Sequence, residues 1–202
     1  MSPKELLINS TIYAVVILLI CPLGGAMFNK ILTTLLSAIC RAFDRSGKLF
    51  LCLANTLTFM GVVFHELSHA FVAFILGAKI RKINLYKRNG NQLGSVIYSP
   101  KGPAMLKSIQ MSISAAAPVF MGVITQLFMF YALQNVNMPV WLVIFLCYLS
   151  FSIAMHMDMS ADDVMVYLKG APICFLLMIV VMAVVGYFVN LPVLTQYIKQ
   201  FL

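Results

Sequence analysis

Charged residues are scarce in this 202-residue chain: Asp, Glu, Lys and Arg together make up 10% of it, whereas 62% of the residues are hydrophobic. Soluble domains carry about 25% charged residues, so the composition excludes an ordinary soluble protein. It is typical of an integral, multi-pass membrane protein. We expect an all-α bundle that forms a single domain over residues 1–202.

Cysteines indicate neither a disulfide framework nor a thiolate metal site. The five of them are odd in number and scattered, and most lie in apolar stretches, where cysteine acts as a small packing residue. The net charge of +8 does not indicate a nucleic-acid partner either. Seven of the Lys and Arg residues lie between Lys79 and Lys107, directly after an apolar stretch, where flanks that contact anionic lipid carry them. The expected partner is therefore the lipid bilayer.

Long apolar stretches predict about five transmembrane helices. The expected spans are Leu6–Met27, Leu49–Leu76, Met105–Leu133, Met138–Met155 and Gly170–Asn190. The first is longer than the apolar part of a signal peptide, so we expect a retained anchor. Residues 1–48 then form an anchor helix and linker, residues 49–170 the core, and residues 171–202 the last span and an interfacial tail. Within the linker, residues 31–40 are either an interfacial helix or an extension of their neighbours.

Two local patterns interrupt this scheme. In Lys79–Ser99, apolar residues such as Ile83 and Val96 alternate with other positions, and Asn89-Gly90 is a strong turn signal. We expect a small membrane-associated β-hairpin there; the alternative is an irregular basic loop.

In the third span, Ala115-Ala116-Ala117-Pro118 predicts close helix contact and a kink. Neighbouring helices can satisfy the backbone group that the proline frees, so a bundle tolerates such a kink.

The main functional signal is Phe64-His65-Glu66-Leu67-Ser68-His69-Ala70, near the end of the second span. Residues four apart share a helix face, so His65 and His69 can bind one metal ion while Glu66 points at a water beside it. Zinc hydrolases use this arrangement: neutral imidazoles hold the metal, one position stays open, and a base takes a proton from water. Chance placement of packed histidines is disfavoured, because a lone carboxylate at membrane depth costs about 3 kcal/mol.

A catalytic zinc site needs a third protein ligand. It should come from a second polar cluster, which holds His156, Asp158, Asp162 and Asp163. Two membrane crossings separate the clusters, so both lie on the same side. Ser160 followed by Asp163 also has the pattern of a helix N-terminus, where acidic residues stabilise the helix without binding a metal.

The order of these elements resembles the site-two protease family of intramembrane zinc metalloproteases. The resemblance rests on the His-Glu motif, on Gly77-Ala78-Lys79 after it, on Ser114-Ala115-Ala116-Ala117-Pro118 in the next span, and on an aspartate before a later span. It covers roughly Leu49–Gly170. The motif alone is shared by many zinc hydrolases, but its place in a membrane helix with this order of elements is much more specific.

The resemblance implies Zn²⁺ as the cofactor, with His65 and His69 as ligands and Glu66 as the general base. The family's third ligand is an aspartate that often precedes a glycine, and this chain has no Asp-Gly. The Ser-x-x-Asp pattern of divergent members matches Ser160 to Asp163. Asp163 is therefore the predicted ligand.

Other assignments stay open at this stage. Asp158 and then Asp162 are the alternative ligands, and His156 would support a ligand or donate to the transition state. The PDZ module that many members carry has no room in this chain.

These features predict hydrolysis of peptide bonds in membrane-spanning or membrane-associated substrates by zinc-activated water. The alternatives are an inactive membrane pseudoprotease or binding protein with a structural metal, and a transporter. The spacing of the motif disfavours a transporter, and the sequence shows no pair of matching broken helices that would indicate inverted repeats. If the hairpin is cytoplasmic, Lys4, the basic stretch Lys79–Lys107 and Lys169 share its side, which places the active site toward the cytoplasm. The basic linker Lys30–Lys48 argues against this orientation.

Overall fold

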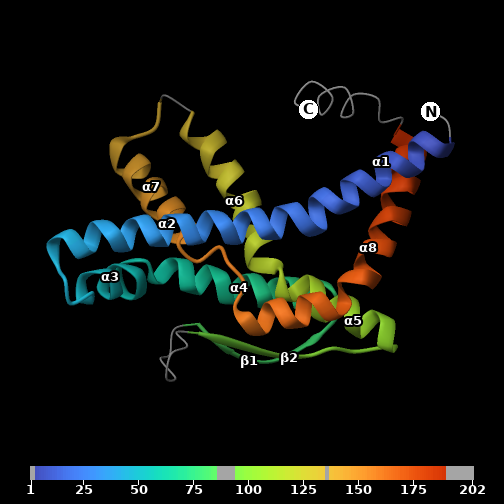
Figure 1. The fold of residues 1–202 in the computed structure, drawn as a ribbon, viewed down its shortest axis with the longest axis horizontal. Coiled ribbons are helices and arrows are strands. Elements are labelled where there is room, and N and C mark those ends of the chain that lie inside the picture. The colour runs from blue at the N-terminus through green and yellow to red at the C-terminus, as the bar shows by residue number, and fades with distance from the viewer. Residues whose placement is uncertain (1–2, 86–93, 135–136, 190–202) are drawn as a thin grey trace.

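The structure is a computed structural model that describes residues 3–85, 94–134 and 137–189 (Figure 1). It is mostly helical with one small sheet, as the sequence predicts. The N-terminal elements are α1 (Pro3–Val15), the π-helical turn η1 (Val16–Ile20), α2 (Cys21–Phe43), α3 (Lys48–Cys52), the π-helical turn η2 (Leu53–Leu57) and α4 (Phe59–Ile75). The later elements are β1 (Lys79–Asn84), β2 (Ser95–Ser99), α5 (Ala104–Ala115), α6 (Ala117–Leu133), α7 (Val140–Ala154) and α8 (Ala161–Val189).

The N-terminal helices form one continuous run. Glu5–Phe43 is 39 residues long and apolar enough to cross a membrane. It contains the expected span Leu6–Met27 and also residues 31–40, which are therefore an extension of the first helix. The π-helical turn η1 inside this run loosens the helix without ending it.

Two of the other expected spans are broken. The helical segment of α3 and η2 meets α4 at 51°, and α5 meets α6 at 50°. The second break lies at Ala116, directly before Ala117 and Pro118, so the kink predicted from the proline is confirmed. The first break lies at Thr58, where no proline marks it. The structure therefore contains two bent helix pairs, and the break at Thr58 was not expected from the sequence.

Five transmembrane helices are not confirmed. Among the described residues, Glu5–Phe43 and Ala161–Tyr187 are long and apolar enough to span a membrane, and the count rises to four if each bent pair is one span. α7 has 15 residues, fewer than a bilayer crossing usually needs. Large apolar side chains such as Phe128 and Leu176 are exposed on the outer faces, which is typical of a surface that contacts lipid.

The last expected span also has different limits. α8 begins at Ala161, earlier than the predicted start at Gly170, because the capping residues before it already support a helix. The predicted interfacial tail, Leu191–Leu202, lies outside the described residues. The first turn of α8 therefore carries Asp162 and Asp163 of the second polar cluster, and the rest of the helix is long and apolar.

β1 and β2 form the predicted antiparallel hairpin. Its ladder runs from Lys79 opposite Ser99 to Asn84 opposite Ser95. The hairpin packs on α4, on the side away from the outer ends of α6 and α7 (Figure 1). The predicted turn at Asn89-Gly90 lies outside the described residues. The hairpin is thus placed beside the helix that carries the His-Glu motif.

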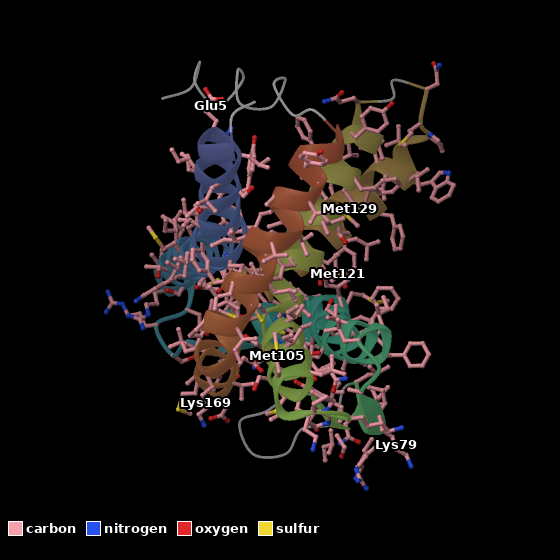
Figure 2. All side chains as sticks on the ribbon, turned by 90° about the vertical axis from the view of Figure 1, so that its right-hand side faces the viewer. Glu5, Lys79, Met105, Met121, Met129 and Lys169 are labelled. Carbon is pink, nitrogen blue, oxygen red and sulfur yellow. The ribbon has the colours of Figure 1, made fainter. Side chains whose placement is uncertain are left out.

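The hairpin and the N-terminus lie at opposite ends of the molecule. Figure 2 shows Lys79 and Lys169 toward one end and Glu5 at the other. The sequence-based orientation placed Lys4 on the side of the hairpin. Lys4 precedes Glu5, so it lies at the other end of the molecule. Lys79 and Lys169 remain as basic residues on the side of the hairpin.

Gly61 allows α7 to pack directly on α4. Its N–H donates to Ser152 Oγ at 2.8 Å, and this hydroxyl donates to the carbonyl oxygen of Thr58 at 3.0 Å. A Cβ on Gly61 would overlap the backbone carbonyl of Ser152 and lie 2.5 Å from Cδ2 of His156. The two helices are therefore in backbone contact one turn before the His-Glu motif.

Gly61→Ala is expected to lower the free energy of unfolding by about 1–3 kcal/mol, because the backbone of α7 cannot move aside as a flexible side chain could. Denaturant titration in detergent micelles measures this. Gly24→Ala in α2 is the matched control, since nothing lies within 4 Å of the position of its Cβ. Equal stability of the two variants would contradict direct packing of α7 on Gly61.

Candidate metal centre

α4 presents the His-Glu motif to a cavity between itself, β2 and the segment that joins α7 to α8. Glu66 and His69 are buried and His65 is half-buried. The cavity has a volume of about 350 Å³, and its walls contain residues of both polar clusters together with Gly94 and three residues of β2. The fold therefore brings together the two clusters that the sequence predicts to meet.

Backbone carbonyls orient both imidazole rings. His65 Nδ1 lies 2.8 Å from the carbonyl oxygen of His156, and His69 Nδ1 lies 2.7 Å from that of Ser114. A carbonyl oxygen only accepts, so each Nδ1 carries a hydrogen, and each Nε2 of a neutral ring keeps a free lone pair. The two Nε2 atoms face each other at 3.1 Å. Two lone pairs this close repel each other unless a proton or a cation lies between them.

Asp163 completes this group. Its Oδ2 lies 3.7 Å from His69 Nε2, and the donor atoms of His65, His69 and Asp163 are all within 4.8 Å of one another. Two ligands bound at about 2.1 Å to a tetrahedral zinc ion lie about 3.4 Å apart, which falls between the 3.1 Å from His65 Nε2 to His69 Nε2 and the 3.7 Å from His69 Nε2 to Asp163 Oδ2. Two imidazoles and one carboxylate also leave a fourth position open. The donor set therefore fits Zn²⁺.

Asp163 also caps α8. Ser160 donates to Asp163 Oδ2 from its N–H at 3.1 Å and from its hydroxyl at 2.6 Å, and Asp163 N–H donates to Ser160 Oγ at 3.1 Å. This reciprocal capping box is the helix N-terminus that the sequence predicts. The same carboxylate faces the imidazoles, so capping and metal binding are compatible.

The two alternative aspartates line the same cavity but do not belong to the three-residue group. Asp162 is exposed in the first turn of α8. Asp158 is half-buried, and burial raises the pKa of its carboxyl. Of the three aspartates, Asp163 is the one that this geometry favours as the third ligand.

His156 supports His65 from the segment after α7. Its carbonyl accepts the hydrogen bond from His65, and its ring Nε2 lies 3.0 Å from Thr58 Oγ1, at the break before α4. Burial, and then the nearby His65, lower the pKa of His156 to about 4, so its ring is neutral at pH 7. Because Thr58 binds this ring, His156 is better suited to positioning a ligand than to donating to a transition state.

Glu66 lies directly under Gly94, the residue that precedes β2. A Cβ added to Gly94 would lie 2.5 Å from Glu66 Cγ and 2.8 Å from Glu66 Oε1. Any other residue at this position would push the strand or the carboxylate aside. Gly94 therefore lets the backbone of the hairpin form the cavity wall next to the candidate base.

Tyr98 and Ser114 were not predicted as site residues. Gly94, Val96 and Tyr98 are alternate positions, share a face and line the cavity. Burial, and then the charge of Asp163, raise the pKa of the Tyr98 phenol. The Ser114 hydroxyl is fully buried, makes no hydrogen bond of standard geometry, and interacts with this phenol. The alternation of the predicted hairpin could have placed Tyr98 on the cavity face, whereas no sequence signal marked the hydroxyl of Ser114.

Asp163→Ala is expected to lower the zinc content of the purified protein at least about tenfold, because a ligand is lost. Elemental mass spectrometry measures the metal. Asp162→Ala and Asp158→Ala should keep their zinc, and Ser160→Ala separates loss of the cap from loss of the ligand. Zinc loss in Asp158→Ala with retention in Asp163→Ala would reverse the assignment.

Pro118 explains why the Ser114 carbonyl lacks its usual helical partner four residues later and can accept from His69. In a continuous helix this carbonyl would accept from the N–H of residue 118, and proline has none. Pro118→Ala supplies a competing N–H. We expect zinc affinity to fall about 10- to 100-fold, as for other losses of a ligand's hydrogen-bond partner.

Competition with a chelator measures this affinity. Pro172→Ala is the matched control, because it also replaces a proline inside a helix but does not line the cavity. Equal zinc affinity of the two variants would contradict the role assigned to Pro118.

Comparison of the sequence with protein-family models and with curated proteins gives no match, and comparison of the fold with solved structures gives none either. The chemistry of the cavity must therefore be inferred from its side chains. These side chains are the oriented imidazoles of His65 and His69, the carboxylate of Asp163 beside them, and Glu66, which is buried on α4 with the two histidines.

Proposed function

We propose that this chain is an intramembrane zinc metalloprotease that resembles the site-two protease family. The observation that carries the proposal is the convergence of His65, His69 and Asp163, with Glu66 in the same cavity. These residues supply three metal ligands and a separate base, which metal-assisted hydrolysis of a peptide bond requires. Two to four helices that could cross a membrane support a location in the bilayer.

The roles of the residues follow from their positions. When bound, zinc would lower the pKa of water toward 7 and polarise the substrate carbonyl. Glu66 takes a proton from the attacking water and passes it to the leaving amine as the C–N bond breaks. His65 and His69 hold their Nδ1 hydrogens against backbone carbonyls, which keeps both Nε2 atoms turned to the centre.

An unwound substrate segment can approach the cavity along β2. A helical substrate has its carbonyls in its own hydrogen bonds, so it must unwind locally before water can attack. Among the described residues, β2 pairs with β1 on one edge, and β2 is the strand that lines the cavity. An extended peptide can pair with the other edge. We therefore expect a membrane-spanning or membrane-associated polypeptide as the substrate.

The hairpin end of the molecule is the proposed cytoplasmic side. Lys79 and Lys169 lie toward that end (Figure 2). Basic residues concentrate in the cytoplasmic flanks of membrane proteins. The cavity lies beside the hairpin, so the active site would face the cytoplasm.

Glu66→Gln is expected to keep its zinc and to lose cleavage by about 10²- to 10⁴-fold, because the amide cannot take a proton from water. Mass spectrometry of single-span peptides incubated with the protein in liposomes measures cleavage. Glu5→Gln is the matched control, since Glu5 lies at the opposite end of the molecule (Figure 2).

The outcomes separate the candidate functions. Undiminished cleavage by Glu66→Gln rules out Glu66 as the base. A wild-type protein that binds zinc but cleaves no peptide would favour the alternative, a membrane binding protein with a structural metal.

A further inference from the structure

The proposed reaction needs a hydrogen-bond donor that the ligands and the base do not supply. Addition of water to a peptide carbonyl places negative charge on its oxygen, and a donor aimed at that oxygen lowers the barrier. Apart from the proposed ligands, the cavity wall contains four hydroxyl or imidazole side chains, Ser95, Tyr98, His156 and Ser160.

Two of the four are engaged elsewhere. The Ser160 hydroxyl donates to Asp163 Oδ2 at 2.6 Å as part of the cap of α8. The ring of His156 is bound through Nε2 to Thr58 Oγ1 at 3.0 Å. Moving either group to a substrate would disrupt the helix start or the segment that orients His65.

Ser95 belongs to the other face of β2. Its Oγ accepts a hydrogen bond from Asn84 Nδ2 of β1 at 3.1 Å. Alternation along the strand turns its side chain away from the face that carries Gly94 and Tyr98. Tyr98 is the remaining donor.

Tyr98 lines the same cavity as the proposed base, Glu66. Four residues along a strand separate it from Gly94, a distance of about 13 Å. Gly94 touches Glu66, whereas Tyr98 interacts with Ser114, whose carbonyl holds His69. An extended peptide paired with β2 would therefore pass both Glu66 and the phenol.

We propose that the Tyr98 hydroxyl donates a hydrogen bond to the scissile carbonyl oxygen as it becomes an oxyanion. This inference rests on the proposed function. The oxygen of water bonds to the carbonyl carbon, its proton passes through Glu66 to the amine, the C–N bond breaks, and Tyr98 keeps its own proton throughout. A tyrosine is protonated at pH 7, so its O–H can donate. The buried Ser114 hydroxyl can donate to the phenol oxygen and leave the phenol hydrogen for the substrate.

Tyr98→Phe is expected to lower kcat about 10²- to 10³-fold with little change in KM, because the hydrogen bond strengthens only as charge develops. Its zinc content should equal that of the wild type. Tyr131→Phe is the matched control; Tyr131 is exposed on α6, and the variant should cleave at the wild-type rate.

A binding measurement tests the same bond without turnover. A phosphinic peptide, which carries a tetrahedral centre, should bind Tyr98→Phe more weakly than wild type by the factor lost in kcat/KM. If Tyr98→Phe cleaves peptide and binds the phosphinic peptide as well as the wild type does, the inference is overturned. The proposed function still stands in that case, provided that Glu66→Gln is inactive. Zinc loss in Tyr98→Phe would also overturn it, since the residue would then be structural. Absence of cleavage by the wild type would overturn both proposals.

Discussion

The candidate centre depends on two hydrogen bonds in which imidazole Nδ1 atoms of α4 donate to backbone carbonyls of other elements. The bond from His65 reaches His156, after α7, and the bond from His69 reaches Ser114, in α5. They fix the tautomer of each ring and turn both Nε2 atoms to one point. The helix spacing alone would put the two side chains on one face without aiming their nitrogens. The bonds also tie α4 to its neighbours, so the same contacts hold the bundle and the site.

Prolines inside or between helices leave acceptors for such bonds. A carbonyl inside a regular helix is already paired, but one that lies four residues before a proline is not. Ser114 precedes Pro118 in this way and receives His69. Leu18 precedes Pro22 in the same way, and the Tyr167 hydroxyl of α8 donates to its carbonyl. Each proline thus removes a bond within one helix and allows one between helices.

Local patterns in the sequence indicated several structural features around the cavity. The four-residue spacing of His65 and His69, the capping box of Asp163 and the bend before Pro118 are all properties of neighbouring residues on one helix. The hairpin was recognised from alternation for the same reason. The number of spans was not, because a straight helix and a pair broken at Thr58 have equally apolar compositions.

The sequence by itself determined which residues carry metal-binding and basic groups, since their spacing is fixed by helix geometry. Only the tertiary structure decided which aspartate approaches the imidazoles, what His156 does, and that Tyr98 lines the cavity. These outcomes depend on contacts between segments as far as 98 residues apart, such as Thr58 with His156. No local rule specifies them, because they arise from how the bends and small residues let separate helices and a strand pack together.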